Sequence, residues 1–260
     1  MAVPPLFIFE DGLCERLYPL TYARPASELR VGTLTLRERL QLRLPQPAAG
    51  LLCRDSQAGV WRHTLEGAIP VNPAVSMQEG MVLLNARWLA LGNGGAFDIP
   101  PADTANLQQD SIVWIHLSAE LAGSIDIAAL HLPRTLEAVL PRVRRLSSPA
   151  TLINRPWDLF THQRAAIEED FARLGPANDA ATFSGVHFLG AANIHLAKGV
   201  KIWPGAVLDA QGGPIIVEEA AEIRANAVIT GPVVIGPHCV VRTGADIREE
   251  TVLGPGSRVG

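Results

Sequence analysis

A branched aliphatic residue stands at every sixth position through the last part of the chain, and this period constrains the fold more than any other feature. Eight consecutive positions keep the register: Val217, Ile223, Ile229, Ile235, Val241, Ile247, Leu253 and Val259. Four positions after each of the first seven stands a small or slim residue: Ala221, Ala227, Val233, Cys239, Ala245, Thr251 and Ser257. Neither the 3.6-residue period of an α-helix nor the alternation of an ordinary strand produces this pattern. Each hexad is therefore expected to form one short strand and one turn.

The same period continues upstream, at Leu196, Ile202 and Leu208, and then slips by three residues at 211–214, which we interpret as a loop extruded from the coil. Three hexads per coil, with Pro and Gly in the turns, resemble the left-handed parallel β-helix of hexapeptide-repeat acyltransferases. A β-sandwich with accidental spacing is the alternative. The sequence stops at Gly260, in the middle of a hexad. An uncapped solenoid end exposes backbone and apolar surface, so we expect a longer protein, or another segment or subunit over this end.

Composition excludes several classes of protein. Apolar residues make up 48% of the 260 residues and charged residues 18%, which excludes a disordered chain and suits two folded units. The formal charge of −4 argues against a nucleic-acid partner. No apolar run approaches the roughly 18 to 20 residues that span a bilayer, and no secretory signal opens the sequence, so we expect a cytoplasmic protein with no membrane partner. Three cysteines without CxxC spacing indicate neither a disulfide framework nor a thiolate metal site.

The N-terminal half reads as an α/β domain with a Rossmann-like sheet. Residues 6–9 form an apolar run typical of a buried strand, and a polar loop follows over residues 10–21. Thr35 and Glu38 then form a capping-box pattern that opens a helix with Leu36 and Leu40 on one face, ending before Pro45. A strand, a loop and a helix in this order place a ligand at the carboxyl end of the first strand.

The stretch from Phe9 to Gly32 resembles the signature of sugar-phosphate nucleotidyltransferases. Gly12 matches a glycine of its turn, and the remaining matches are Arg16-Leu17, Pro19-Leu20-Thr21, Arg24-Pro25 and Val31-Gly32. The resemblance implies a nucleotide and a sugar phosphate as partners. It also implies that the turn amides at Gly12, together with Arg16 and Arg24, bind the phosphates. Catalysis of this kind depends mainly on positioning and charge stabilisation.

The departures from that signature are equally specific. Cys14 stands in place of the second glycine, Glu15 in place of the Thr, and Ala26 in place of the Lys that neutralises the departing pyrophosphate. Two carboxylates, Glu10 and Asp11, stand beside the expected polyphosphate, where they suit Mg²⁺ but without a metal would repel the substrate. The family's metal-holding Asp after a central strand is replaced by Asn85, for which we expect a sugar or interdomain contact.

The order of several motifs is similar to that of a divergent branch described as GlmU-like sugar nucleotidyltransferases. These motifs are Phe9-Glu10-Asp11, Pro19-Leu20-Thr21, Arg24-Pro25, Glu28-Leu29-Arg30-Val31-Gly32 and Pro156-Trp157-Asp158-Leu159. We interpret Trp157 and Asp158 as interdomain packing or a sugar contact, with Asp158 as the N-cap of a helix that runs through Leu174. That helix is expected to carry an apolar stripe of Phe160, Ile167, Phe171 and Leu174 and to end at Gly175-Pro176. The resulting organisation is a nucleotidyltransferase-like domain over 1–155, a linker helix over 156–176 and the β-helix over 185–260.

Three functional hypotheses follow from these patterns. The first is a transferase that converts an NTP and a sugar 1-phosphate to an NDP-sugar and pyrophosphate, with Mg²⁺, in amino-sugar and cell-envelope precursor metabolism. The second is an acetyl-CoA-dependent acyltransferase acting on a sugar amine, whose histidine-bearing catalytic segment does not occur before residue 260. His238 is the only histidine deep in the regular hexads, and we interpret it as an exposed turn residue. The third is a catalytically inactive scaffold. The resemblance implies a homotrimer through the β-helix, and no catalytic residue is assigned.

Overall fold

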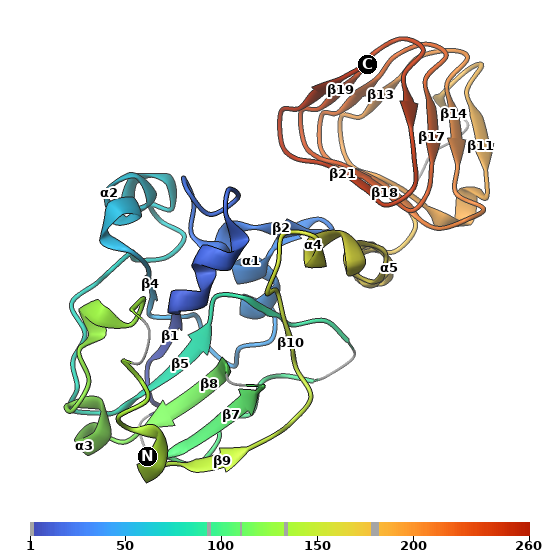
Figure 1. Cartoon of the computed structure of the whole chain (residues 1–260). Coiled ribbons are helices and arrows are strands. Elements are labelled where there is room, and N and C mark those ends of the chain that lie inside the picture. Colours follow the sequence, from blue (N-terminus) through green and yellow to red (C-terminus); the bar gives the residue numbers. More distant parts are fainter. Residues whose placement is uncertain (1–2, 93–94, 110, 133–134, 178–181) are drawn as a thin grey trace. The chain divides into compact units, whose positions relative to one another are not determined.

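The computed structural model describes residues 3–92, 95–109, 111–132, 135–177 and 182–260. The chain divides into two compact units, one of residues 1–29 and 34–158 and the other of residues 30–33 and 159–260 (Figure 1). The second unit therefore includes a four-residue excursion of the N-terminal chain and the helical segment that the sequence suggested as a linker. Each unit has its own apolar core.

A six-stranded mixed sheet forms the centre of the first unit. Its spatial order is β4 (Gly50–Leu52), β1 (Leu6–Phe9), β5 (Met81–Asn85), β8 (Ser111–Leu117), β7 (Thr104–Gln108) and β9 (Arg144–Leu146). The three strands β4, β1 and β5 are parallel, whereas β8 is antiparallel to both β5 and β7, and β9 is parallel to β7. Strands β1 and β5 are buried along their whole length, as continuous apolar runs inside parallel sheets usually are.

Short helices and strands complete the first unit. Its α-helices are α1 (Leu36–Gln41), α2 (Asp55–Thr64) and α3 (Ala119–Ala122). Its 3₁₀ helices are η1 (Gly12–Leu17), η2 (Ala26–Glu28), η3 (Ile127–Ala129) and η4 (Leu140–Arg142). Strand β3 (Leu34–Thr35) leads into α1, and β6 (Trp88–Leu89) pairs antiparallel with β10 (Thr151–Leu152). The expected capping box is confirmed, since Thr35 and Glu38 bond each other's backbone at the start of α1. That helix ends at Gln41, four residues before Pro45.

The second unit is a left-handed parallel β-helix, as the sequence predicts. Its three faces are parallel sheets of four short strands each. The first face contains β11 (His187–Leu189), β14 (Val207–Asp209), β17 (Val228–Thr230) and β20 (Asp246–Ile247). The second contains β12 (Ile194–Leu196), β15 (Ile215–Val217), β18 (Val233–Ile235) and β21 (Thr251–Leu253). The third contains β13 (Lys201–Ile202), β16 (Glu222–Ile223), β19 (Val240–Val241) and β22 (Arg258–Val259).

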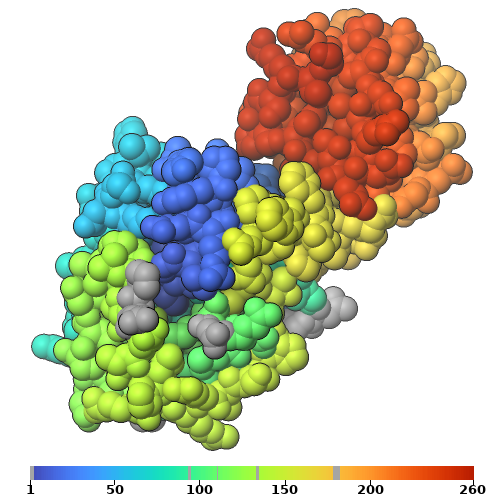
Figure 2. Space-filling model, viewed as in Figure 1, coloured from blue at the N-terminus to red at the C-terminus, as the bar shows by residue number. Residues whose placement is uncertain are grey.

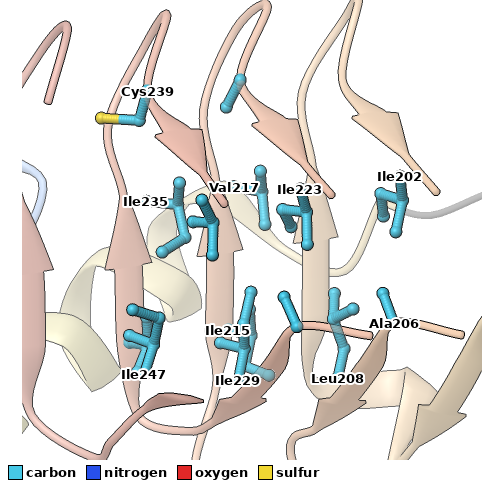
Figure 3. Packing of buried hydrophobic residues seen from close by; sticks show 14 of the residues in the cluster. Ile202, Ala206, Leu208, Ile215, Val217, Ile223, Ile229, Ile235, Cys239 and Ile247 are labelled. Atoms are coloured by element: carbon cyan, nitrogen blue, oxygen red, sulfur yellow. The ribbon is translucent and has the colours of Figure 1, made fainter. Parts of the chain in front are cut away.

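Strand register explains the slip in the six-residue period. Ile215 pairs with Val233, 18 positions on, whereas Ile194 pairs with Ile215, 21 positions on. The three additional residues lie between β14 and β15, where the sequence indicated an extruded loop. From Val217 to Ile247 the aliphatic residues of the period are buried, and they point into one stacked interior (Figure 3).

In the turns of the β-helix, residues with a left-handed backbone conformation are stacked from one coil to the next. Gly205 has φ +81° and Asn226, one coil later, has φ +59°. A Cβ atom at Gly205 would lie 2.1 Å from the Asn226 Oδ1 atom, so glycine is required there both by its backbone conformation and by the close approach of the next coil.

Two consecutive helices replace the single helix expected after Asp158. These are α4 (Asp158–Thr161) and α5 (Gln163–Leu174), separated at His162. Asp158 is the first residue of α4, and its carboxylate accepts the N–H groups of Asn154 and Arg155 rather than capping a longer helix. The expected apolar stripe is correct for Ile167 and Phe171. It is wrong for Phe160, which is 72% exposed because the break at His162 puts it on a different helix, and for Leu174, which is 38% exposed at the end of α5.

Helix α5 packs on one outer face of the β-helix. Ile167 and Phe171 contact Ile216, Val234 and Val252, the outward-pointing residues of three stacked strands. This cover explains why all three residues of β15 and of β18 are buried although neighbouring residues in a strand point to opposite faces. The excursion at residues 30–33, which contains β2 (Arg30–Val31), belongs to the same unit: the Thr33 N–H donates to the buried carboxylate of Asp170 on α5.

Candidate functional site

The loop after β1 begins the candidate site. Asp11 caps η1 by accepting the N–H of Leu13, and the Thr21 hydroxyl closes the loop by donating to the Cys14 carbonyl. On its far side the loop is held by α2, because the side chains of Gln57 and Trp61 donate to the carbonyl groups of Thr21 and Ala23. In Figure 2 the blue N-terminal segment accordingly lies at the surface beside the cyan segment that contains α2. The loop thus stands at the carboxyl edge of β4, β1 and β5, where parallel sheets bind ligands.

Asp11 forms a bidentate ion pair with Arg87. The Nε and Nη2 atoms of Arg87 lie 2.9 and 2.6 Å from the two carboxylate oxygens. Asn85, the last residue of β5, donates its side-chain amide to Asp11 at 2.9 Å. The Arg87 guanidinium is fully buried and also donates to the side-chain oxygen of Asn154 at 2.5 Å and to the Ser111 hydroxyl at 3.3 Å. Paired arginine and carboxylate groups of this geometry are among the stronger polar contacts in proteins.

Glu10 forms the matching pair with Arg54. Its fully buried carboxylate accepts from the Nε and Nη2 atoms of Arg54 at 3.1 and 3.3 Å and from the Ala26 N–H at 2.8 Å. Arg54 also donates to the Tyr18 hydroxyl and to the Thr21 carbonyl, so it ties the loop to the end of β4. Burial by itself lowers the pKa of Arg54, but the adjacent Glu10 carboxylate outweighs it and the pKa is raised.

These contacts do not fit a magnesium ion held jointly by Glu10 and Asp11. Every carboxylate oxygen of the two residues accepts a hydrogen bond from an arginine, and a cation beside them would lie against two guanidinium groups. Magnesium binds oxygen ligands in near-octahedral geometry. Within the described ranges, moreover, no three His, Cys, Asp or Glu side chains gather as a metal site.

A cavity of about 500 Å³ opens beside the loop, and three of the sequence-predicted residues line it: Asp11, Gly12 and Arg16. Its other polar residues include Ser111, Thr135, Glu137, Asn154 and Arg155, and its apolar walls include Phe9, Leu13, Ile112, Leu130, Leu132, Leu136 and Leu140. We call this the Arg16 pocket. Because Arg87 neutralises Asp11, the exposed Arg16 and Arg155 favour an anionic ligand here.

A smaller cavity of about 260 Å³ borders the Arg16 pocket, since Leu130 lines both. It lies at the end of β4, and its polar residues are Asp55, Asn72 and His131, with Cys53 beside them. Asn72 is fully engaged in holding the turn after β4, where it bonds the Cys53 backbone twice and the Asp55 carboxylate once. The remaining lining is mainly aliphatic.

Other predicted residues stand elsewhere. Glu10 is fully buried and does not line the Arg16 pocket. Arg24 is exposed at the end of the loop and does not line the Arg16 pocket. Asn85 does not line the pocket itself but donates to Asp11, which does, and Trp157 is 62% exposed. Asp158 holds the backbone of Asn154 and Arg155, two residues that do line the pocket, so the Pro156–Leu159 motif helps to position part of the wall.

Sequence reasoning missed Arg54, Arg87, Asn154 and Arg155. Arg155 adjoins the Pro156–Leu159 motif, and Arg87 follows Asn85 by two residues, so adjacency to predicted residues was the available signal. Arg54 has no such signal, since its partner Glu10 is 44 positions away.

The two cysteines near the site are protonated thiols. Burial, followed by the charges of Glu10 and Asp11, raises the pKa of Cys14 well above its ordinary value. Burial and Glu10 raise the pKa of Cys53 from 9.0 to about 12. A thiolate is the nucleophilic form of cysteine, so neither residue suits nucleophilic catalysis.

Comparison with known proteins gives a family for the first unit. The family model described as sugar nucleotidyl transferase matches residues 6–177, which include the whole Arg16 pocket and both ion pairs. A search of the curated proteins gives no match. None of the described helices is long and apolar enough to cross a membrane. Since the family model covers well over half of the chain, the chain belongs to the sugar nucleotidyl transferase family.

Proposed function

We propose that the chain transfers a nucleotidyl group from an NTP to a sugar 1-phosphate, giving an NDP-sugar and pyrophosphate. The observation that carries this proposal is the Arg16 pocket, which has Arg16, Arg155 and the Gly12 backbone at the carboxyl end of β1, inside a domain of this family. An oxygen of the sugar phosphate attacks the α-phosphorus of the NTP, and the bond between the α- and β-phosphates breaks. Pyrophosphate leaves with the electron pair of that bond.

Charge stabilisation is the contribution that these residues make. The phosphates carry several negative charges, and guanidinium groups bind phosphate oxygens with directed N–H donors. Arg16 and Arg155 bind the phosphates from the pocket wall, and Gly12 lets the backbone approach them closely. Arg24, at the exposed end of the loop, is proposed as a second contact to the polyphosphate.

Pyrophosphate release is the measurement that tests the proposal. Four NTPs are crossed with a panel of hexose and amino-sugar 1-phosphates in the presence of Mg²⁺, which stays an expected requirement. Amino sugars are included because the resemblance to GlmU-like proteins points to amino-sugar and cell-envelope precursors. Release with one pair supports the proposal. If calorimetry detects nucleotide binding but no pair releases pyrophosphate, the domain binds its ligand without the chemistry, as the inactive-scaffold hypothesis holds.

Substitution of Arg16 tests the pocket assignment. We expect Arg16→Ala to weaken nucleotide binding at least about tenfold, because one charged hydrogen-bonding partner of the phosphates is lost. Arg16 is exposed, so the melting temperature should not change. Arg24→Ala, measured in parallel, tests the second contact, and Arg248→Ala on the β-helix is the control because its side chain is 82% exposed. Unchanged binding in Arg16→Ala would refute its role.

The β-helix supports acetyl transfer as a second candidate, since hexapeptide-repeat acyltransferases have this fold. This second function predicts that free CoA is released from acetyl-CoA in the presence of a sugar amine. The assay is independent of pyrophosphate release and can be run on the same preparation.

A further inference from the structure

Two acidic residues follow β1, and each is paired with an arginine that follows a neighbouring strand. Arg54 comes two residues after β4 and pairs with Glu10, and Arg87 comes two residues after β5 and pairs with Asp11. The carboxyl edge of the three parallel strands therefore carries two acids and two guanidinium groups in contact with one another.

The hydrogen bonds leave little room for a metal at these acids. Asp11 accepts five, from the Leu13 backbone, the Cys14 thiol, the Asn85 amide and twice from Arg87. Glu10 accepts four, from the Ala26 backbone, the Arg54 backbone and twice from the Arg54 guanidinium. A cation that replaced these donors would leave a fully buried guanidinium unpaired, at a large cost in free energy.

The same contacts give Arg87 a direct connection to the Arg16 pocket. Besides Asp11, it donates to Asn154 and to Ser111, and all three residues line the pocket. Arg87 thus fixes three polar side chains of one wall and places a permanent positive charge behind them. Since an arginine guanidinium stays protonated at any physiological pH, this charge needs no bound ion.

We infer that Glu10 and Asp11 bind arginines and not a metal. Arg54 and Arg87 supply the positive charge at the end of β1 that the sequence led us to expect from a protein-bound divalent cation. Arg87 is a positioning residue in this arrangement. A phosphate-bearing ligand then binds the Arg16 pocket without a metal held by these carboxylates. The choice of a phosphate-bearing ligand rests on the proposed function.

Binding of Mn²⁺ alone to the full chain is the first test, because it needs no substrate and no variant of a buried residue. Electron paramagnetic resonance counts free Mn²⁺ during a titration. We expect the isotherms of the wild-type chain and of Asp11→Asn to agree. A one-to-one Mn²⁺ site that is present in the wild-type chain and lost in Asp11→Asn would overturn the inference.

Binding of inorganic pyrophosphate, with and without a chelator, is the second test. Because Mg²⁺ also complexes free pyrophosphate, calorimetry in EDTA and in Mg²⁺ is run on both the wild-type chain and Asp11→Asn. The change in affinity between the two conditions should agree within about twofold between the two proteins if these carboxylates hold no metal. A loss of affinity in EDTA that is about tenfold or more larger in the wild-type chain than in Asp11→Asn would overturn the inference.

Arg87→Met adds a readout that a purely structural role would not change. With the guanidinium removed, Asp11 faces the pocket as an uncompensated charge. Pyrophosphate affinity in EDTA should fall at least about tenfold, and Mg²⁺ should restore part of it. Arg39→Met is the matched control: Arg39 is equally buried in the same unit but does not line the pocket, so it should not create a dependence on Mg²⁺. Equal loss with and without Mg²⁺ in Arg87→Met would count against the inference.

Failure of the inference and failure of the proposed function give different results. A chain whose pyrophosphate binding depends on Mg²⁺ to the same extent in the wild type and in Asp11→Asn, but that forms no NDP-sugar, supports the inference and contradicts the proposed reaction. A chain that forms NDP-sugar but loses a Mn²⁺ site in Asp11→Asn does the reverse. If Arg87→Met does not fold, the Mn²⁺ and EDTA measurements on the wild-type chain and on Asp11→Asn still decide.

Discussion

Cys53 illustrates how a single buried charge affects its neighbours. The thiol is buried at the end of β4, and Glu10 lies close enough to disfavour its ionisation. Glu10 is itself stable in the interior only because Arg54 pairs with it, since an unpaired buried carboxylate is strongly destabilising. The Glu10–Arg54 ion pair therefore holds the loop, whereas burial, with a smaller contribution from Glu10, raises the pKa of the Cys53 thiol.

The raised pKa of Cys53 predicts a pH dependence of stability. The pKa is about 12 in the folded chain against an ordinary 9.0, so the neutral thiol contributes stability that is complete below pH 9 and is lost as the pH rises from 9 toward 12. Between pH 8 and pH 10 the free energy of unfolding should fall by about 1 kcal/mol more in the wild-type chain than in Cys53→Ala. Urea titrations of both proteins at the two pH values measure this difference, and parallel losses would contradict the prediction.

The position of helix α5 decides which outward-pointing strand residues of the β-helix are buried. Its residues Ile167 and Phe171 cover the outward side of Ile216 and Val234. The neighbouring face has no such cover at Val228, which is 38% exposed. Both Val234 and Val228 point away from the interior of the coil, so only the helix distinguishes them.

Because only one of the two valines is covered, we expect the same substitution to lower the free energy of unfolding by different amounts at the two positions. Val234→Ala should lower the free energy of unfolding by about 2 kcal/mol, because buried methyl groups lose their contacts with α5. Val228→Ala should change it by no more than about 0.5 kcal/mol, as is usual at the surface. Urea unfolding of the two variants measures both values. Equal effects would mean that α5 does not cover this face in solution.

At the scale of the whole molecule, the β-helix presents apolar side chains to solvent. Leu189, Trp203 and Val228 are 42%, 51% and 38% exposed, although they lie on strands or beside them in a well-packed coil. Trp203 is the largest of these exposed side chains, and we use it to test whether this surface is an interface between chains.

We therefore expect the homotrimer that the resemblance to hexapeptide-repeat proteins implies. Light scattering coupled to size-exclusion chromatography should give a mass about three times that of one chain. Trp203→Glu should reduce the mass to that of a single chain if this surface is the interface, whereas Arg248→Glu, at an 82% exposed side chain, is the control. A clean monomer for the wild-type chain would contradict the prediction.

Local patterns were sufficient for much of the fold. The six-residue period predicts the β-helix and its buried aliphatic column, the three-residue slip marks the extra residues between β14 and β15, and the capping box at Thr35 predicts the start of α1. Each of these features can be detected from a spacing that repeats along one continuous stretch of the sequence. The run at residues 6–9 predicts β1 and so the edge of the sheet where the loop with Asp11, Gly12 and Arg16 stands.

The amino-acid sequence by itself thus determined the β-helix, the first strand of the N-terminal sheet and the family signature in the loop after it. Only the tertiary structure decided which charges meet. Asp11 and Arg87 are 76 positions apart, and Asn154 is 67 from Arg87, so no local pattern connects them. The sheet order decides these contacts, because it places β4 and β5 on either side of β1 and brings Arg54 and Arg87 to its two acids. The sequence did not determine, for the same reason, that α5 covers Val234. A helix of moderate amphipathicity can pack on any of three similar faces, and the contacts of its side chains select one of them.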